Sequence, residues 1–319
     1  MTAERFVRLG RLNPGDRVAV VGTSSPIGEG DVDRISALAG RLDLEPVVYP
    51  SVTAIHHDLP YLSGSDRLRA DDLTAAWCDD SVVAVWASRG GYGAMRMLDL
   101  CDWAAMAGAN PKLLLGYSDV TCVHEAVAAR LGLATLHAPM PASDRVASSE
   151  PTVEHLRSVL FDPQSSAARN PAGATALTTL VDGSAEGWLT GGNLSVLAST
   201  VGSPTALPDR EGALVFLEEL NARPYEIDRN LTTLLRAGWF DGVVGVVLGG
   251  LTDRGTPPDP QDLAPALRVF TERLASLGVP VAAGLPVGHD EVNLTLPLGV
   301  LARLDATSGT LRLLQTALI

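Results

Sequence analysis

Ser118 lies at the junction between a short apolar run and a predicted helix. Residues 113–116 read LLLG, and residues 120–132 read VTCVHEAVAARLG, in which apolar residues recur at helical spacing. A strand that turns through a glycine into a helix raises a serine hydroxyl out of the backbone, and it directs the helix N-terminus toward the group that the serine attacks. From this stretch alone, Ser118 or Asp119 could instead be a simple helix cap.

Two further residues would complete the chemistry that such a serine needs. Glu218 lies near the end of the buried run GALVFLEEL at 212–220, and His289 follows VPVAAGLPVG at 279–288. A serine hydroxyl is a weak nucleophile that needs a base, and a histidine can act as that base near neutral pH. A carboxylate can orient the imidazole, and the chain order Ser, Glu, His is one of several known orders. A triad is therefore predicted, although Glu218 could pair with an arginine and His289 could be an ordinary loop residue.

Alternating strands and helices must position Ser118 in the first half of the chain. Apolar runs predict strands at 17–22, 45–51, 81–88, 112–118 and 133–140, with helical patterns between them. This alternation predicts an α/β fold with a doubly wound, flavodoxin-like parallel sheet. Functional residues of such sheets lie at the carboxyl ends of the strands. The residues predicted at this edge are Ser24, Ser25, residues 89–93, Ser118 and His137.

A smaller α/β domain is predicted to follow. Residues 1–150 form the predicted N-terminal domain, residues 151–180 are a crossing rich in Ser, Ala and Pro, and residues 181–319 form the C-terminal domain. The glycine pair at 191–192 predicts a turn before a helix. Because the nucleophile lies in the first domain and the acid and base lie in the second, the active site is predicted between them.

Composition excludes several classes of function. The net charge of −13 over 319 residues argues against a nucleic-acid partner. No apolar run approaches the roughly 18 residues of a membrane span, and the N-terminus lacks the features of a signal peptide. These observations predict a soluble, cytoplasmic protein without a membrane partner. The three cysteines have neither metal-ligand nor disulfide spacing.

The order and spacing of many motifs resemble the LD-carboxypeptidase family of serine peptidases, also called muramoyltetrapeptide carboxypeptidases. The resemblance covers nearly the whole chain. It is carried by VAVVGTSSPI at 18–27, YLSGSDRLRADDL at 61–73, ASRGGYGAMRMLDLCD at 87–102, GYSDVT at 116–121, HAPM at 137–140, LTGGNLSVL at 189–197, LVFLEELNARPYEIDRNL at 214–231 and GLPVGHDEVNLTLPLG at 284–299.

The resemblance implies a role for individual residues. Ser118 would be the nucleophile, Glu218 the acid and His289 the base, and the backbone amides of Gly91 and Asp119 would form the oxyanion hole. No metal or organic cofactor is implied.

A positive group is also predicted at the site, because an acidic protein would otherwise repel a substrate carboxylate. The candidates are Arg89, beside the glycine run, and Arg229, in a predicted helix of the second domain.

The resemblance also implies the reaction, which is release of terminal D-alanine from a murein tetrapeptide during cell-wall recycling. The alternative is the microcin C immunity branch of the same family, which hydrolyses peptidyl- or aminoacyl-nucleotide amides with the same triad. Family members often form homodimers, and the sequence does not decide the oligomeric state.

Other functions fit less well. Residues 89–93 lack the G-x-G-x-x-G pattern and the lysine of nucleotide-phosphate loops. Val120 stands where an ordinary α/β-hydrolase has the last glycine of G-x-S-x-G. A binding module without turnover is the third alternative, and a substrate assay would distinguish it.

Overall fold

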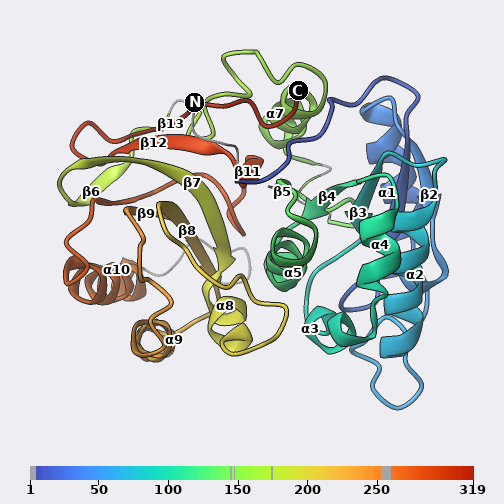
Figure 1. The fold of residues 1–319 in the computed structure, drawn as a ribbon, viewed down its shortest axis with the longest axis horizontal. Helices are drawn as coiled ribbons and strands as arrows, with labels where there is room; N and C mark the ends of the chain where they lie inside the picture. The colour runs from blue at the N-terminus through green and yellow to red at the C-terminus, as the bar shows by residue number, and fades with distance from the viewer. Residues whose placement is uncertain (1–4, 144–145, 147, 174, 253–259) are drawn as a thin grey trace.

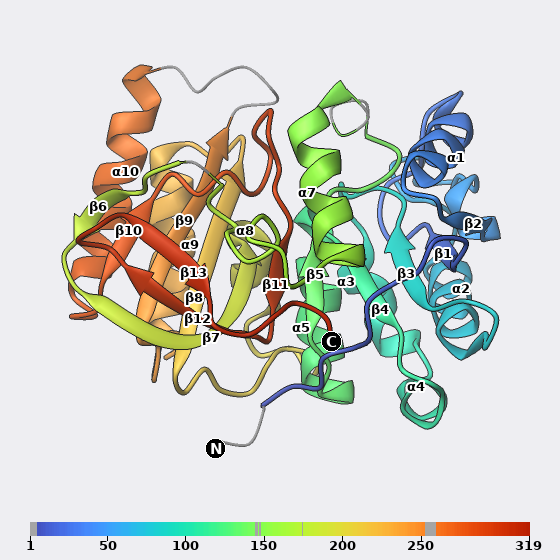
Figure 2. The same cartoon turned by 90° about the horizontal axis from the view of Figure 1, so that it is seen from above.

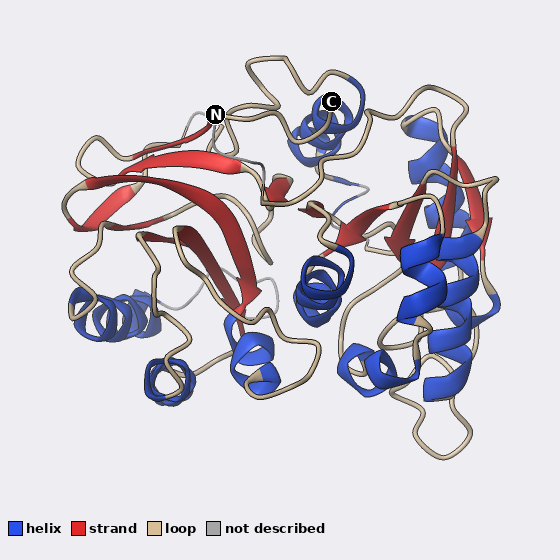
Figure 3. Cartoon of the chain, in the orientation of Figure 1, coloured by secondary structure: helices blue, strands red, loops and turns tan. Residues whose placement is uncertain are grey.

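The computed structural model describes residues 5–143, 146, 148–173, 175–252 and 260–319, which form two β-sheets flanked by helices (Figures 1 and 3). The predicted two-domain α/β architecture is confirmed. The exact domain limits at 1–150 and 181–319 stay a prediction.

The N-terminal sheet has six strands in the order β11-β5-β4-β3-β1-β2. Five of them are parallel, as predicted: β1 (Arg17–Val21), β2 (Glu45–Val48), β3 (Ala84–Ala87), β4 (Leu113–Gly116) and β5 (Thr135–His137). The sixth, β11 (Leu296–Leu298), comes from the far end of the chain and pairs antiparallel with β5. The second half of the chain therefore completes the first sheet.

Each face of this sheet has its own core, because successive strand residues point to opposite faces. On one face Val85 and Leu114 pack with Leu73 and Val123, whereas on the other Trp86 and Leu115 pack with Leu156. The helices of this half are α1 (Asp31–Arg41), α2 (Asp66–Cys78), α3 (Ala94–Met97), α4 (Trp103–Gly108), α5 (Thr121–Leu131) and α7 (Glu150–Phe161). Helix α7, from the predicted crossing, thus covers the first sheet (Figure 2).

The C-terminal sheet has seven strands in the order β13-β12-β7-β8-β9-β10-β6, and it is mixed. Its strands are β6 (Thr178–Val181), β7 (Ser184–Asn193), β8 (Ala213–Leu220), β9 (Gly245–Thr252), β10 (Val281–Ala283), β12 (Leu301–Asp305) and β13 (Thr310–Leu313). Helices α8 (Leu194–Thr200), α9 (Pro224–Arg236) and α10 (Pro260–Ala275) lie along one face (Figure 1). Among the residues that the structure describes, no helix is long and apolar enough to span a bilayer.

The glycine pair at 191–192 lies inside β7, and the predicted turn there was wrong. A Cβ on Gly191 would lie 1.9 Å from the Phe216 carbonyl oxygen of β8, and one on Gly192 would lie 2.5 Å from Thr121 Oγ1 of α5. Close packing, rather than a reversal of the chain, therefore explains why glycine occupies both positions. Their small size lets Thr121 Oγ1 accept the Asn193 amide at 3.0 Å, which joins the end of β7 to α5.

Candidate active site

Ser118 occupies a strained turn between β4 and α5. Its φ of 64° is in the left-handed region, which costs a non-glycine residue about 1–2 kcal/mol, and strained backbone of this kind clusters at functional sites. The turn is tight, because a Cβ on Gly116 would lie 2.8 Å from Val120 Cγ1. No side chain caps the start of α5, so the structure does not support the capping interpretation of Ser118 and Asp119.

The structure brings Ser118, His289 and Glu218 into one hydrogen-bonded chain. His289 Nε2 lies 3.0 Å from Ser118 Oγ, and His289 Nδ1 lies 2.6 Å from Glu218 Oε2. With Nδ1 donating to the carboxylate, Nε2 is free to accept the serine proton. Glu218 is fully buried near the end of β8 and contacts a histidine rather than an arginine.

His289 lies in a loop after β10, a strand that is shorter than predicted and ends at Ala283. The preceding residue, Gly288, has a φ of 122°, and a Cβ there would lie 3.0 Å from Glu218 Cβ. A glycine before His289 thus lets the loop approach the acid closely.

The neighbouring carboxylate, Glu219, points away from His289, as adjacent strand residues must. It accepts the Ser195 amide at 2.9 Å and the Asn193 side-chain amide at 3.2 Å. Burial raises the pKa of Glu219. Through these hydrogen bonds, Glu219 fixes the start of α8.

The Tyr117 ring packs beside His289, and sequence reasoning did not identify this contact. The Tyr117 ring lies 4.9 Å from the His289 ring and 5.7 Å from the His137 ring. His137 is fully buried, and burial holds its pKa well below the usual range, so it stays neutral. The adjacency of Tyr117 to Ser118 was the only signal in the sequence.

The loop at 89–93 approaches the nucleophile, as expected at this edge of the sheet. A Cβ on Gly90 would lie 3.2 Å from Ser118 Oγ. Ser25 holds the loop, since its amide donates to the Gly90 carbonyl at 3.2 Å and its Oγ accepts the Tyr92 amide at 3.2 Å. The oxyanion role of the Gly91 and Asp119 amides stays a prediction.

Ser118 opens into a cleft of about 440 Å³ that residues of both halves line. Leu220 and His289 come from the second half, whereas Arg89, Gly90 and Gly91 are among those from the first. The site therefore lies between the two sheets, as predicted. Within the described residues, His, Cys, Asp and Glu side chains do not gather in threes as a metal site would require.

The two arginines that the sequence singled out lie in different places. Arg89 lines the Ser118 cleft and donates to the Pro26 carbonyl at 2.9 Å. Arg34, which the sequence analysis missed, lines the same cleft and pairs with Asp31. No local pattern distinguishes Arg34 from other helix-surface arginines.

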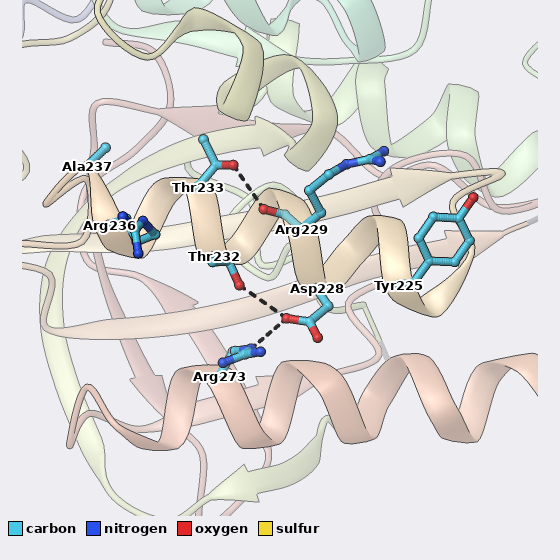
Figure 4. Close-up of a pocket in the computed structure, with 8 residues that line it drawn as sticks. All are labelled: Tyr225, Asp228, Arg229, Thr232, Thr233, Arg236, Ala237 and Arg273. Atoms are coloured by element: carbon cyan, nitrogen blue, oxygen red, sulfur yellow. Dashed lines mark hydrogen bonds and ion pairs between the residues drawn. The ribbon is translucent and has the colours of Figure 1, made fainter.

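Arg229 is not brought to the nucleophile, which corrects its expected placement beside Arg89. It lines a separate pocket along α9, together with Tyr225, Asp228 and Arg273 (Figure 4). Its position on α9 directs the side chain toward the Tyr225 ring, whose centroid lies 5.9 Å from the guanidinium carbon.

Two domain families match this chain. Residues 18–138 match the LD-carboxypeptidase N-terminal domain, and residues 186–304 match the LD-carboxypeptidase C-terminal domain. The two matched ranges correspond to the two halves of the fold. The N-terminal match contains Ser118, and the C-terminal match contains Glu218 and His289.

Full-length relatives are similar to this chain. A Streptomyces coelicolor protein, named provisionally as a carboxypeptidase, is 47% identical over 98% of both chains. The probable murein peptide carboxypeptidase of Bacillus subtilis is 32% identical over 94% of this chain and 92% of its own. The murein tetrapeptide carboxypeptidase of Pseudomonas aeruginosa is 29% identical, over 91% and 93%.

Solved structures share the fold. The muramoyltetrapeptide carboxypeptidase of Oxalobacter formigenes has a TM-score of 0.74 and 26% identity, covering 93% of this chain and 97% of its own. The microcin C7 self-immunity protein in complex with aspartyl sulfamoyl adenosine has a TM-score of 0.80 and 22% identity, covering 98% and 100%.

Proposed function

The chain belongs to the LD-carboxypeptidase family and is a serine-type carboxypeptidase, and from this premise we propose that it releases terminal D-alanine from murein tetrapeptides. The observation that carries the proposal is the chain of hydrogen bonds from Ser118 through His289 to Glu218 at the wall of an open cleft. The names of the Bacillus subtilis and Pseudomonas aeruginosa relatives support a murein peptide as the substrate. The proposed setting is cell-wall recycling in the cytoplasm, and the bond is the one between the L-centre of a diamino acid and D-alanine.

The proposed mechanism has two half-reactions. His289 Nε2 takes the Ser118 proton as Oγ attacks the carbonyl carbon, and Glu218 stabilises the imidazolium through Nδ1–H. The Gly91 and Asp119 amides would bind the oxyanion. His289 then protonates the leaving nitrogen of D-alanine, and water repeats the cycle on the acyl-enzyme.

The substrate is tested by incubating the enzyme separately with murein tetrapeptide and with an aminoacyl sulfamoyl adenosine. We expect free D-alanine from the first and no free nucleoside from the second, measured by chromatography. The opposite result would assign the chain to the alternative reaction, hydrolysis of aminoacyl-nucleotide amides. A failure to turn over either compound would contradict the proposed activity.

Arg89→Ala is expected to raise KM while leaving kcat nearly unchanged. Its guanidinium lines the Ser118 cleft and would bind the terminal carboxylate equally in the ground and transition states. A charge-assisted hydrogen bond contributes about 1.5–3 kcal/mol, so KM should rise roughly 10- to 100-fold.

Arg229→Ala is the matched control, because this arginine lines a different pocket. Initial-rate kinetics on murein tetrapeptide should give this variant a wild-type KM. An unchanged KM in Arg89→Ala would remove Arg89 from the substrate-binding residues, and Arg34 would then be the next arginine to test among the described residues that line the cleft.

A further inference from the structure

We propose that the Asp119 carboxylate is a positioning residue that holds the glycine loop at 89–93 in place beside Ser118. This role is distinct from that of the Asp119 backbone amide, and it rests on the proposed reaction at Ser118. Asp119 would thereby couple the two sides of the oxyanion hole through a single residue.

The Asp119 carboxylate is buried under the end of the loop. Only 4% of the residue is exposed, and Oδ2 accepts the Ala94 amide at 2.9 Å. The Gly93 amide and the Ser24 hydroxyl also act on this carboxylate, since both lower its pKa. It therefore holds the point at which the loop enters α3.

Ser25 holds the loop itself, through Gly90 and Tyr92. Glycines restrict their own backbone little, so hydrogen bonds from outside must fix the positions of Gly90 and Gly91. Asp119 supplies one such bond just beyond the loop, to the Ala94 amide, and it directly follows the nucleophile in the chain. Movement of its side chain would shift the loop relative to Ser118.

A buried cation accompanies this carboxylate. Arg69 has no exposed surface, donates to the Thr23 carbonyl at 2.7 Å and pairs with Asp66. Burial raises the pKa of Asp119, and the Ala94 amide, the Ser24 hydroxyl and the charge of Arg69 oppose that rise. A Cβ on Gly93 would lie 2.5 Å from Arg69 Nη1, so the arginine packs directly against the end of the loop.

The expected effect on catalysis depends on the reaction stage at which an oxyanion hole acts. Its donors interact most strongly with the charge that develops in the transition state. A displacement of about 1 Å in the groups that hold the reacting atoms can lower the rate about 100-fold. Loss of the Asp119 carboxylate should therefore lower kcat and leave KM nearly unchanged.

Asp119→Asn tests this role, because it preserves the shape of the side chain but removes its negative charge and replaces one of its two acceptor oxygens with an NH2 group. We expect kcat on murein tetrapeptide to fall about 100-fold with little change in KM. The pH profile of kcat/KM should keep its shape, since Ser118, His289 and Glu218 are untouched.

Asp72→Asn is the matched control for loss of a buried carboxylate. Asp72 is similarly buried, and its Oδ2 accepts the Ser51 amide at 2.6 Å, away from the glycine loop. This variant should lower Tm but keep the wild-type kcat per folded molecule. A wild-type kcat in Asp119→Asn, or equal losses of kcat in both variants, would overturn the proposal.

A fluorophosphonate probe makes the test independent of the peptide substrate. Ser118 Oγ bonds to phosphorus, fluoride leaves, His289 takes the serine proton, and the phosphoryl oxygen occupies the oxyanion hole. Asp119→Asn should label about 100-fold more slowly than the wild type, and Asp72→Asn at the wild-type rate. If wild-type protein labels but releases no D-alanine, the proposed substrate fails while the role of Asp119 is still measured. Equal labelling rates in wild type and Asp119→Asn refute only the positioning role.

Discussion

Ser118→Ala is expected to abolish release of D-alanine. Its Oγ is the atom 3.0 Å from His289 Nε2, and it stands on the strained turn between β4 and α5. Removing the nucleophile of a comparable triad lowers kcat about 10⁶-fold. The measurement is D-alanine release by a preparation free of wild-type enzyme. Turnover above a few per cent of wild type would refute Ser118 as the nucleophile.

Ser118→Gly separates loss of chemistry from loss of fold. The φ of 64° is strained for serine and alanine but not for glycine. The glycine variant should be equally inactive, yet more stable than Ser118→Ala by about 1 kcal/mol. Denaturant unfolding of both variants checks this. If Ser118→Ala lost activity only because it unfolded, the more stable glycine variant would regain turnover.

Glu218→Gln is expected to lower kcat about 10⁴-fold, by analogy with amide replacement of a triad acid. The glutamine amide can donate to Nδ1, which favours the wrong imidazole tautomer. Glu218 is fully buried, and its carboxylate lies 2.6 Å from His289 Nδ1. Steady-state kinetics on murein tetrapeptide measure the loss.

Glu219→Gln is the adjacent control. Glu219 binds the Ser195 amide and the Asn193 side chain at the start of α8 and does not contact His289. It should keep nearly the wild-type kcat while unfolding more easily, by about 1–3 kcal/mol for a disturbed buried hydrogen-bond acceptor. A large loss of kcat in Glu219→Gln with an active Glu218→Gln would transfer the acid role to Glu219.

The geometry of the triad depends on contacts between the two sheets. Thr121 of α5 binds the Asn193 amide at 3.0 Å, and the buried Arg210–Glu125 pair joins the same helix to the second half at 2.7 Å. Strand β11 pairs with β5. These contacts lie on both sides of the segment that carries Ser118, and they hold the nucleophile beside the base and the acid that the second half of the chain supplies.

Much of this arrangement was determined by the sequence itself. The alternation of apolar runs and helical patterns predicted the parallel sheet, because strand and helix periodicities are local. The run of three leucines into Gly116 predicted the strand–turn–helix unit at Ser118. The order of the motifs identified the family, and with it the three residues that the structure joins by hydrogen bonds.

Only the tertiary structure decided how distant segments meet. It placed Glu218 toward His289 and Glu219 toward α8, located Arg229 outside the cleft, and added β11 to the first sheet. It also explained Gly191 and Gly192 by packing rather than by a turn. Each of these outcomes depends on how two sheets and their helices pack. Local propensity and periodicity cannot encode that packing, because the contacting residues lie far apart in the chain.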